Sequence, residues 1–442
     1  MLEFETTTLL RGDAAAGSAA ASRNVRRVYA EAGLFALSSR LWQMQLLSMY
    51  LFALRPDARF VGLAEGVQGV ARLVAFCVVG PMVDRCPRQR LLRAAAAFGL
   101  LVHGAAAALL LRDEPPLQEW LAVLGAFAVY ATLQQSLADS VFADCVASGD
   151  RVRPYTVYGV VRQASMLFSP LAQMGVFGGR DENNRWTQEA LQPALLTGVA
   201  LGALSCCVLG SLNAKAALGA ASDALGSDGN GRAVAAAAES APSPAAPAGR
   251  CAATSAASIR WTIFAFDTLR VLSGGLVIKY VGLHFSSALG LTPLGLARVE
   301  LGGFCSMITL TLLAGWLSDP AKGALPRGTV CLGLLLVCDA SNFVVAMVPA
   351  FGVAGAGGAW ALREGTLNAV FALKKSILMD HTPKGARGRW NAVESLQVAI
   401  WSGAAVVSGL VIHDFGYAVV FWAMAVGFVA ATLVWVPLRT IR

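Results

Sequence analysis

The apolar residues of this chain fall in blocks of about twenty, separated by short polar breaks, and this spacing constrains the fold more than any other feature. A helix of roughly twenty apolar residues spans the hydrocarbon core of a bilayer, which is roughly 30 Å thick. Twelve blocks are candidate spans, at residues 33–54, 60–82, 90–111, 118–142, 156–178, 193–212, 259–284, 296–317, 328–349, 352–379, 391–413 and 416–437. The sequence therefore predicts an all-α, polytopic membrane protein.

The composition argues against a soluble enzyme. Of the 442 residues, 56% are apolar and 14% are charged, whereas soluble domains carry roughly 25% charged residues. The sequence contains no Ser-His-Asp set, H-E-x-x-H motif or Gly-rich phosphate loop. Its nine cysteines and four histidines are scattered, and no basic run is interleaved with aromatic residues. We therefore expect no catalytic residues, cofactor, metal site or nucleic-acid partner.

The spans form two sets of six on either side of a polar stretch. We expect a cytoplasmic N-terminal tail at 1–29, a six-helix bundle at 30–212, a disordered cytoplasmic linker at 213–257 and a second bundle at 258–438. The linker is rich in Ala, Ser, Gly and Pro and lacks large apolar residues to bury. The bundles are nearly equal in length, which indicates duplication and predicts twelve transmembrane helices in two pseudo-symmetric six-helix bundles.

The distribution of positive charge predicts the orientation in the membrane. With the N-terminus inside, 23 of the 35 Lys and Arg residues lie in inner segments and five lie in outer loops. This is the bias that the positive-inside rule expects. Both termini and the linker should therefore be cytoplasmic, in either a plasma or an organelle membrane, and we expect a monomer in contact with membrane lipid.

Two charged loop patterns occur once in each half. The second span is followed by Gly80-Pro-Met-Val-Asp84-Arg85 and the eighth by Gly315-Trp-Leu-Ser-Asp319-Pro320. The fourth span is followed by Asp144, with Arg151 and Arg153 at plus seven and plus nine, and the tenth by Asp380, with Arg387 and Arg389 at the same spacings. The separation of Asp84 from Asp319, which we call the repeat offset, differs from that of Asp144 from Asp380 by a single position. The two patterns together therefore indicate an internal repeat.

The loop GPMVDRCPRQR resembles the motif G-x-x-x-D-R/K-x-G-R-R/K of the major facilitator superfamily of secondary transporters. The matching residues are Gly80, Asp84, Arg85 and Arg88. Pro87 replaces the second glycine, Gln89 replaces a basic residue, and the second copy has no basic residue directly after Asp319. Together with twelve spans and a middle linker, the resemblance covers residues 30–438, and it implies two halves that rock around a central solute site.

The charged loop residues are candidates for a cytoplasmic gate. Asp84 can cap the next helix or pair with an arginine across the two halves, near Arg151 and Arg153, and rocking would break such a cluster. The alternative is that these charges only anchor the loops at the lipid headgroups. The candidate gating residues are Gly80, Asp84, Arg85, Arg88, Asp144, Arg151, Arg153, Gly315, Asp319, Asp380, Arg387 and Arg389.

Polar residues inside spans 1, 4, 7 and 10 are candidates for the solute site. A charged group at bilayer depth is costly, so it faces a cavity, a partner or a pathway by default. The resemblance places these four spans around the central cavity. The candidates are Arg40, Gln43, Gln134, Gln135, Asp267, Arg270, Lys279, Arg363, Glu364 and Asn368.

Three local patterns refine this set. Asp267 and Arg270 are three residues apart on one helix face and can pair, either structurally or at the solute. The segment Ser273-Gly274-Gly275 predicts a loosened helix with free backbone groups. A carboxylate shielded from water becomes easier to protonate, which makes Glu364 the best candidate proton carrier. Charges on spans 2, 8 and 9 fit either helix pairing or coupling: Glu65, Arg72, Glu300 and Asp339.

These observations predict a secondary active transporter that moves a small polar or anionic solute by alternating access, with protons as the coupling ion. The excess of cations among the candidate cavity residues favours an anion over a cation. A ferroportin-like exporter of divalent metal is one alternative, because SSRLWQMQ resembles a helix of that family, with Ser39 where an aspartate is usual. A transporter-like receptor that binds without transport is another. Two segments, SGGLVIKYVGLHF and DHTPKGARGRWNAVESL, resemble little-characterised algal and plant members of the superfamily.

Overall fold

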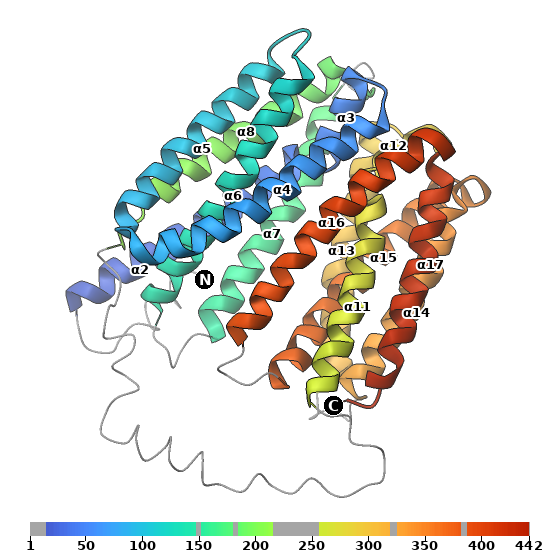
Figure 1. Cartoon of the computed structure of the whole chain (residues 1–442). Helices are drawn as coiled ribbons and strands as arrows, with labels where there is room; N and C mark the ends of the chain where they lie inside the picture. Colours follow the sequence, from blue (N-terminus) through green and yellow to red (C-terminus); the bar gives the residue numbers. More distant parts are fainter. Residues whose placement is uncertain are drawn as a thin grey trace, which may run out of the picture.

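The computed structural model describes residues 15–146, 152–179, 184–214, 256–318, 325–381 and 387–441, and every regular element in these ranges is a helix. The N half comprises α2 (Ala15–Trp42), α3 (Gln45–Leu54), α4 (Ala58–Arg85), α5 (Arg88–Leu110), α6 (Leu117–Cys145), α7 (Val152–Phe177) and α8 (Gln188–Gly210). The C half comprises α11 (Ala256–Val277), α12 (Val281–Leu289), α13 (Pro293–Leu317), α14 (Arg327–Ala346), α15 (Val348–Asp380), α16 (Arg387–Phe415), α17 (Tyr417–Trp435) and the 3-10 turn η6 (Val436–Leu438). Figure 1 shows the two halves side by side.

The helices form six units in each half when α2 is joined to α3 and α11 to α12. Among the described residues, eight helices are long and apolar enough to cross a membrane, and nine if the bent pair α11 and α12 is one span. Three units remain: the joined pair of α2 and α3, the helix α7, and the helix α15. These units are interrupted or more polar than the others. Each of these three supplies side chains to the cavity described below. The predicted all-α, polytopic fold class is confirmed.

The first span differs from the sequence-based expectation at both of its ends. We expected a tail at 1–29 and a continuous span at 33–54, but α2 already begins at Ala15 and ends at Trp42. The segment between 15 and 31 is rich in Ala, the residue with the highest helix propensity, and Val28 and Ala32 are buried. The predicted linker lies largely outside the described residues, so the domain boundaries stay predictions.

Each half contains a broken helix at an equivalent place, and these two breaks are related by the internal repeat. Helix α2 ends at Trp42 and α11 ends at Val277, so the two ends are separated by the repeat offset. After each break the chain resumes as a short helix, α3 or α12, and α11 and α12 are bent by 47°. The repeat that the loop motifs indicate therefore extends into the helix interiors.

The break in span 7 lies one turn later than the sequence predicted. We expected loosening at Ser273-Gly274-Gly275, but these residues are helical and the break falls at 278–280. The glycines serve packing instead, because a Cβ on Gly275 would lie 2.6 Å from Trp401 O of α16. Their function is therefore to let α11 and α16 approach closely.

The halves meet at one end of the bundle. We call the end where α8 ends and α11 begins the linker end, and the other the opposite end. Helix α4 packs on α16 toward the opposite end, where a Cβ on Gly66 would collide with Val406 and one on Gly69 would collide with Ser402. In Figure 1 the blue-to-green and yellow-to-red helices converge toward the top of the view. The structure therefore shows a form that is closed at the opposite end.

Candidate solute-binding site

A cavity of about 150 Å³ lies between the two halves and is lined by residues of α2, α7, α13 and α15. The N half contributes Arg40 and Met166. The C half contributes Glu300, Gly303, Phe304, Met307, Trp360, Glu364 and Asn368. The cavity therefore combines charged groups with aromatic and thioether surfaces, a composition typical of small-molecule sites.

Arg40 is the cation of the cavity wall. Its guanidinium lies 5.2 Å from the centre of the Phe304 ring, and its closest carboxylate is Glu300 Oε1 of the C half, at 3.9 Å from Nη2. No side chain or backbone group within the described ranges accepts a hydrogen bond from Arg40, and its Nε is buried. A guanidinium is a planar donor that matches carboxylate geometry, so its free donors can take up an anionic group.

Glu364 faces the cavity from the C half and is paired with Arg363. Arg363 Nη1 donates to Glu364 Oε1 at 2.5 Å, and Arg363 Nε donates to Asn342 Oδ1 at 2.9 Å. The Arg363 side chain is 2% exposed and stacks on Trp360, with 4.3 Å from Cζ to the ring centroid. The predicted residue Arg363 therefore lies behind the wall, while Glu364, 25% exposed, presents its carboxylate to the cavity.

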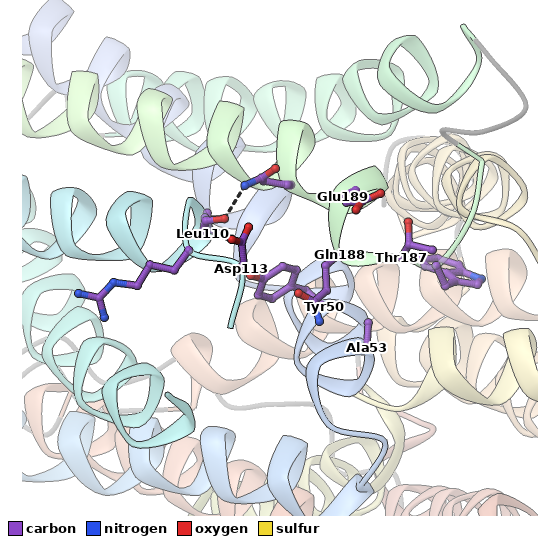
Figure 2. A pocket seen from close by; sticks show the side chains of 10 residues that line it. Tyr50, Ala53, Leu110, Asp113, Thr187, Gln188 and Glu189 are labelled. Carbon is purple, nitrogen blue, oxygen red and sulfur yellow. Dashed lines mark hydrogen bonds between the residues drawn. The ribbon is translucent and has the colours of Figure 1, made fainter. Parts of the chain in front are cut away.

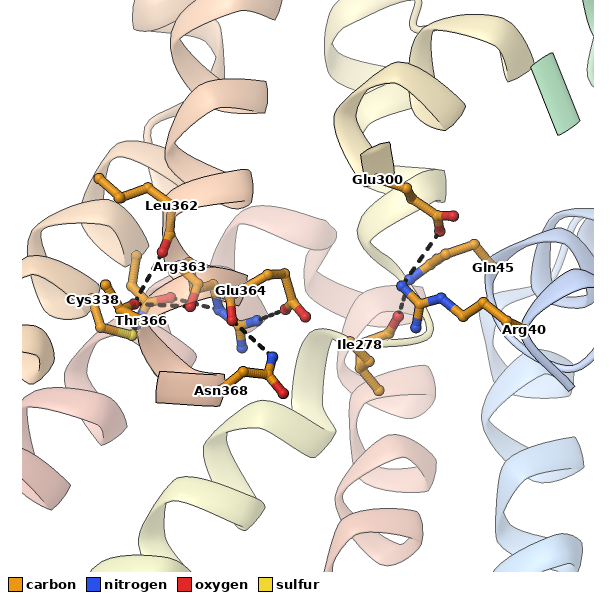
Figure 3. A network of polar contacts seen from close by, with 11 residues as sticks. Arg40, Gln45, Ile278, Glu300, Cys338, Leu362, Arg363, Glu364, Thr366 and Asn368 are labelled. Carbon is orange, nitrogen blue, oxygen red and sulfur yellow. Dashed lines mark hydrogen bonds and ion pairs between the residues drawn. The ribbon is translucent and has the colours of Figure 1, made fainter. Parts of the chain in front are cut away.

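Figure 3 shows Arg40 and Glu364 approaching the space between the halves from opposite sides. Asn368 lies beside Glu364, and its Nδ2 donates to Glu364 O at 2.8 Å. This bond leaves the Asn368 side-chain oxygen to accept from a ligand. The structure thus brings three of the predicted binding residues, Arg40, Glu364 and Asn368, to one cavity.

Two carboxylates that are related by the repeat each form an ion pair with a cation of the other half. Glu65 of the N half and Glu300 of the C half are separated by the repeat offset. Lys279, in the break between α11 and α12, places its Nζ 3.2 Å from Glu65 Oε2. Arg40, which precedes the break in α2, lies 3.9 Å from Glu300. Each half therefore extends a cation from its broken helix to a carboxylate of the other half, and we call these contacts the crossed ion pairs.

The crossed ion pairs lie within a wider set of hydrogen bonds between the breaks. Lys279 Nζ also donates to Gln43 O at 2.8 Å, and Gln45 Nε2 donates to Ile278 O at 2.6 Å, so each break satisfies a carbonyl of the other. Glu65 accepts from Ser402 at 3.3 Å. The predicted binding residues Lys279 and Gln43 therefore join the halves rather than line the cavity, and a backbone oxygen of Gln43 makes that contact.

Closer to the membrane edge, further contacts seal the opposite end. Trp186 Nε1 donates to Leu291 O at 2.6 Å, and Asp57 Oδ1 lies 3.7 Å from His413 Nδ1. Asp57 caps α4 by accepting from Arg59 N at 2.9 Å. Burial disfavours the ionised carboxyl, but the hydrogen bonds from Arg59 outweigh it and hold the pKa of Asp57 below its usual value. Asp57 is therefore ionised near neutral pH and can attract a protonated His413.

The other predicted binding residues lie away from the cavity. Asp267 accepts from Lys374 Nζ at 2.6 and 2.7 Å and lies 3.5 Å from Arg270, so the predicted pair between Asp267 and Arg270 is present within the C half. Gln134 donates to Glu31 at 2.5 Å in the interior of the N half. Gln135 does not line the cavity. The expectation that these four residues contact the solute finds no support in the described geometry.

Three predicted gating charges, Arg88, Asp144 and Asp380, are described in ion pairs, and each pair stays within one half. Arg88 of α5 pairs with Asp144 of α6, and Arg327 of α14 pairs with Asp380 of α15 at 2.7 Å. Gly315 lies in α13. The side chains of Gly80, Asp84, Arg85, Arg153, Arg387 and Arg389, and the residues Arg151 and Asp319, lie outside the described part. A latch across the halves at the linker end therefore stays a prediction.

A second, more open cavity of about 680 Å³ lies within the N half at the opposite end. Figure 2 shows Tyr50, Asp113 and Gln188 around it, and Gln192 Nε2 donates to Leu110 O at 2.5 Å across its wall. It is formed by the ends of α3, α5 and α8, and all of its lining residues belong to the N half. We therefore assign the central cavity as the candidate solute site. Among the described residues, no group of three or more His, Cys, Asp or Glu side chains is placed to hold a metal ion.

Part of the site was not predicted from the sequence. Glu300 and Glu65 were noted without a chosen role, although their separation equals the repeat offset and marks them as equivalent. Phe304, Trp360 and Met166 carry no sequence signal that separates them from other apolar residues of a membrane helix. Glu31, fully buried between Gln134 and Ser205, lies next to the region that was expected to be a tail.

Comparison with known proteins identifies the fold. No protein-family model and no curated protein matches the sequence. Among solved structures, the nucleoside transporter NupG matches with a TM-score of 0.64 at 13% identity, over 95% of this chain and 100% of its own. A bacterial homologue of the iron transporter ferroportin in an inward-facing state matches at 0.65 and 12%, over 95% and 99%. A POT family transporter in complex with 5-aminolevulinic acid matches at 0.68 and 11%, over 94% and 96%.

These structures bind different solutes, and at this identity the likeness concerns the fold alone. It extends over nearly the whole length of each chain and includes both halves. The chain is an integral, multi-pass membrane protein with the fold of the major facilitator superfamily of transporters, as its loop motif implied.

Proposed function

We propose that this protein is a secondary active transporter that moves a small polar or anionic solute across the membrane by alternating access. The observation that carries the proposal is the position of Arg40, a guanidinium with free donors beside a cavity between two repeat-related halves. An arginine at bilayer depth without a hydrogen-bond acceptor is costly unless a ligand or water accepts hydrogen bonds from its guanidinium. A solute that binds Arg40 from between the halves is placed where rocking of the halves exposes it to either side.

The crossed ion pairs supply the barrier on one side. In the described form Lys279–Glu65 and Arg40–Glu300 hold the halves together at the opposite end. Opening that end requires both pairs to break, and the loop charges at the linker end would then form the closing contacts. With the termini cytoplasmic, the end that the described form closes is the outer one.

Proton coupling fits the crossed carboxylates better than it fits Glu364. Glu364 is bonded to Arg363 within the C half, so protonating it changes no contact between the halves. Protonation of Glu65 or Glu300 would remove the attraction for Lys279 or Arg40 and weaken the closed end. We propose that these two residues, rather than Glu364, link the proton to the conformational change.

The test is transport by purified protein in proteoliposomes, recorded as current on a solid-supported membrane. A panel of lactate, succinate, glutamate and neutral polar solutes is applied with and without a pH gradient. We expect at least one solute to give a current that Arg40→Gln abolishes and that Arg112→Gln preserves, because Arg112 forms an exposed pair with Glu119 in the first turn of α6. Because symport of one proton with a monovalent anion carries no net charge, uptake of radiolabelled solute is measured in parallel. Binding of a solute with neither current nor uptake in any condition would contradict transport and favour a receptor.

A further inference from the structure

We propose that the solute is a small zwitterion, an amino acid or a similar amino-carboxylate, whose carboxylate binds Arg40 and whose ammonium binds Glu364 and Asn368. This inference rests on the proposed transport function and names the substrate class of the same cavity. It depends on the juxtaposition of a cation from the N half and a carboxylate from the C half across one small space.

The charge of the cavity differs from the charge that the sequence predicts. Sequence analysis counted Lys279, Arg270 and Asp267 among the cavity residues and obtained an excess of cations. In the structure Lys279 is paired with Glu65, and Asp267 holds Arg270 and Lys374 elsewhere.

The charged groups that remain at the cavity are two cations and two carboxylates. They are Arg40 with Glu300, and Arg363 with Glu364. This set is neutral when both carboxylates are ionised. In a low-dielectric site, an added anion or cation leaves one charge without a partner, whereas a zwitterion adds none. The balance therefore favours a ligand with one positive and one negative group.

The two ends of such a ligand have separate partners. Arg40 donors have no acceptor in the described part of the chain, so a carboxylate can bind them in bidentate geometry. On the other side, Glu364 Oε1 takes the bond from Arg363, which leaves Oε2 and the Asn368 side-chain oxygen to accept from an ammonium group. A ligand that bridges these groups contacts both halves at once, which is what coupling of binding to closure requires.

The remaining wall and the volume set the size of the ligand. Phe304, Met307, Trp360 and Met166 provide the apolar part of the wall, which a hydrocarbon side chain can contact. A cavity of about 150 Å³ holds a molecule of roughly benzene size, or about six to ten non-hydrogen atoms. An aliphatic amino acid fits this space, whereas a nucleoside exceeds it.

The inference is tested with three probes that share one carbon skeleton: L-leucine, L-leucinamide, which lacks the carboxylate, and 4-methylpentanoate, which lacks the amine. Thermal unfolding of the purified full-length protein is measured with each probe, and counterflow of radiolabelled probe is measured in proteoliposomes. We expect leucine to raise the unfolding temperature and to exchange, with at least tenfold weaker apparent affinity for the other two. A higher affinity for 4-methylpentanoate than for leucine, or no response to any probe, would overturn the inference.

Two variants test the assigned contacts. Glu364→Gln leaves Arg363 uncompensated, so it should reduce leucine affinity at least tenfold and raise the affinity for 4-methylpentanoate. Arg40→Gln should instead reduce the affinity for both carboxylates. The control is Glu119→Gln, which removes the same charge in the exposed pair with Arg112. A general loss of folding cannot weaken the binding of leucine and at the same time strengthen the binding of 4-methylpentanoate. If Glu364→Gln lost its response to all three probes, the assignment of Glu364 would be contradicted.

The outcomes separate this inference from the transport proposal. Exchange of 4-methylpentanoate without recognition of leucine would leave transport intact and refute the zwitterion. A leucine-dependent increase in unfolding temperature without counterflow would support zwitterion recognition and refute transport.

Discussion

Replacing Glu65 by Gln should open the end of the molecule that the described form closes. Lys279 is about 10% exposed, and its Nζ is held by Glu65 and by Gln43 O. Removal of one partner from a buried ion pair leaves an uncompensated charge and costs ~3–5 kcal/mol. This cost falls on the closed form, in which Lys279 is confined between the two breaks. A shift of ~3 kcal/mol changes the ratio of closed to open molecules by about 150-fold.

The matched variant is the double substitution Glu65→Gln and Lys279→Met, which removes both charges and keeps an apolar side chain of similar length. Replacing a buried ion pair by groups of similar volume is often close to neutral, so the double variant should return toward the closed form. The comparison isolates the uncompensated charge from any loss of packing.

The assay is the distance between spin labels at two exposed opposite-end positions, Arg55 in the N half and Asp414 in the C half, measured by double electron–electron resonance in a background without exposed cysteines. We expect one short distance in the wild-type protein, a predominant longer distance in Glu65→Gln, and recovery of the short distance in the double variant. Equal distance distributions in all three proteins, or a double variant as open as the single one, would refute the reasoning.

Three further predictions follow from contacts away from the cavity. Asp267→Asn removes the buried carboxylate that contacts both Lys374 and Arg270 and should cost about 3 kcal/mol in thermal or denaturant unfolding, while the relative affinities for solutes stay unchanged. Gly66→Leu forces α4 away from α16 and should lengthen the same spin-label distance, whereas Gly104→Leu, at a glycine with open space around it, should leave that distance unchanged. Arg88→Ala breaks a partly exposed pair within the N half, so it should cost no more than about 1 kcal/mol and leave the spin-label distances unchanged; a large change would place Arg88 in a latch between the halves.

The fold could be predicted from the sequence because the two features that determine it, the length of the apolar spans and the internal repeat, are visible in the sequence itself. Span length is fixed by membrane thickness, and the repeat offset of the loop motifs is visible without structure. The same offset relates the ends of α2 and α11 and the carboxylates Glu65 and Glu300. Equivalent positions of a repeat are therefore the strongest sequence evidence for paired functional residues in this chain.

The site was predicted only in part, because a polar residue inside a span does not reveal which partner it faces. Arg40, Glu364 and Asn368 do meet at one cavity. Gln134 also lies in a span assigned to the cavity, yet it turns inward to Glu31 within the N half. The rotation of a helix about its axis is set by tertiary packing, so charge and depth alone cannot distinguish these cases.

The position of the helix break shows a similar limit. The pair Gly274 and Gly275 is a local signal for flexibility, but close packing against Trp401 uses the same residue type. At the actual break Gln45 of the N half donates to Ile278 O, and Lys279 of this break donates in turn to Gln43 O. Those partners lie on different halves, and no local window of the sequence contains both.

The most direct test of alternating access is the accessibility of the cavity from each side of the membrane. A single cysteine at Met166, in the cavity wall, is labelled with a membrane-impermeant maleimide applied to one face or the other of oriented vesicles. We expect labelling from the linker-end face in the wild-type background and from the opposite face once Glu65→Gln breaks a crossed ion pair. Labelling from one face only, in both backgrounds and with or without solute, would contradict the account.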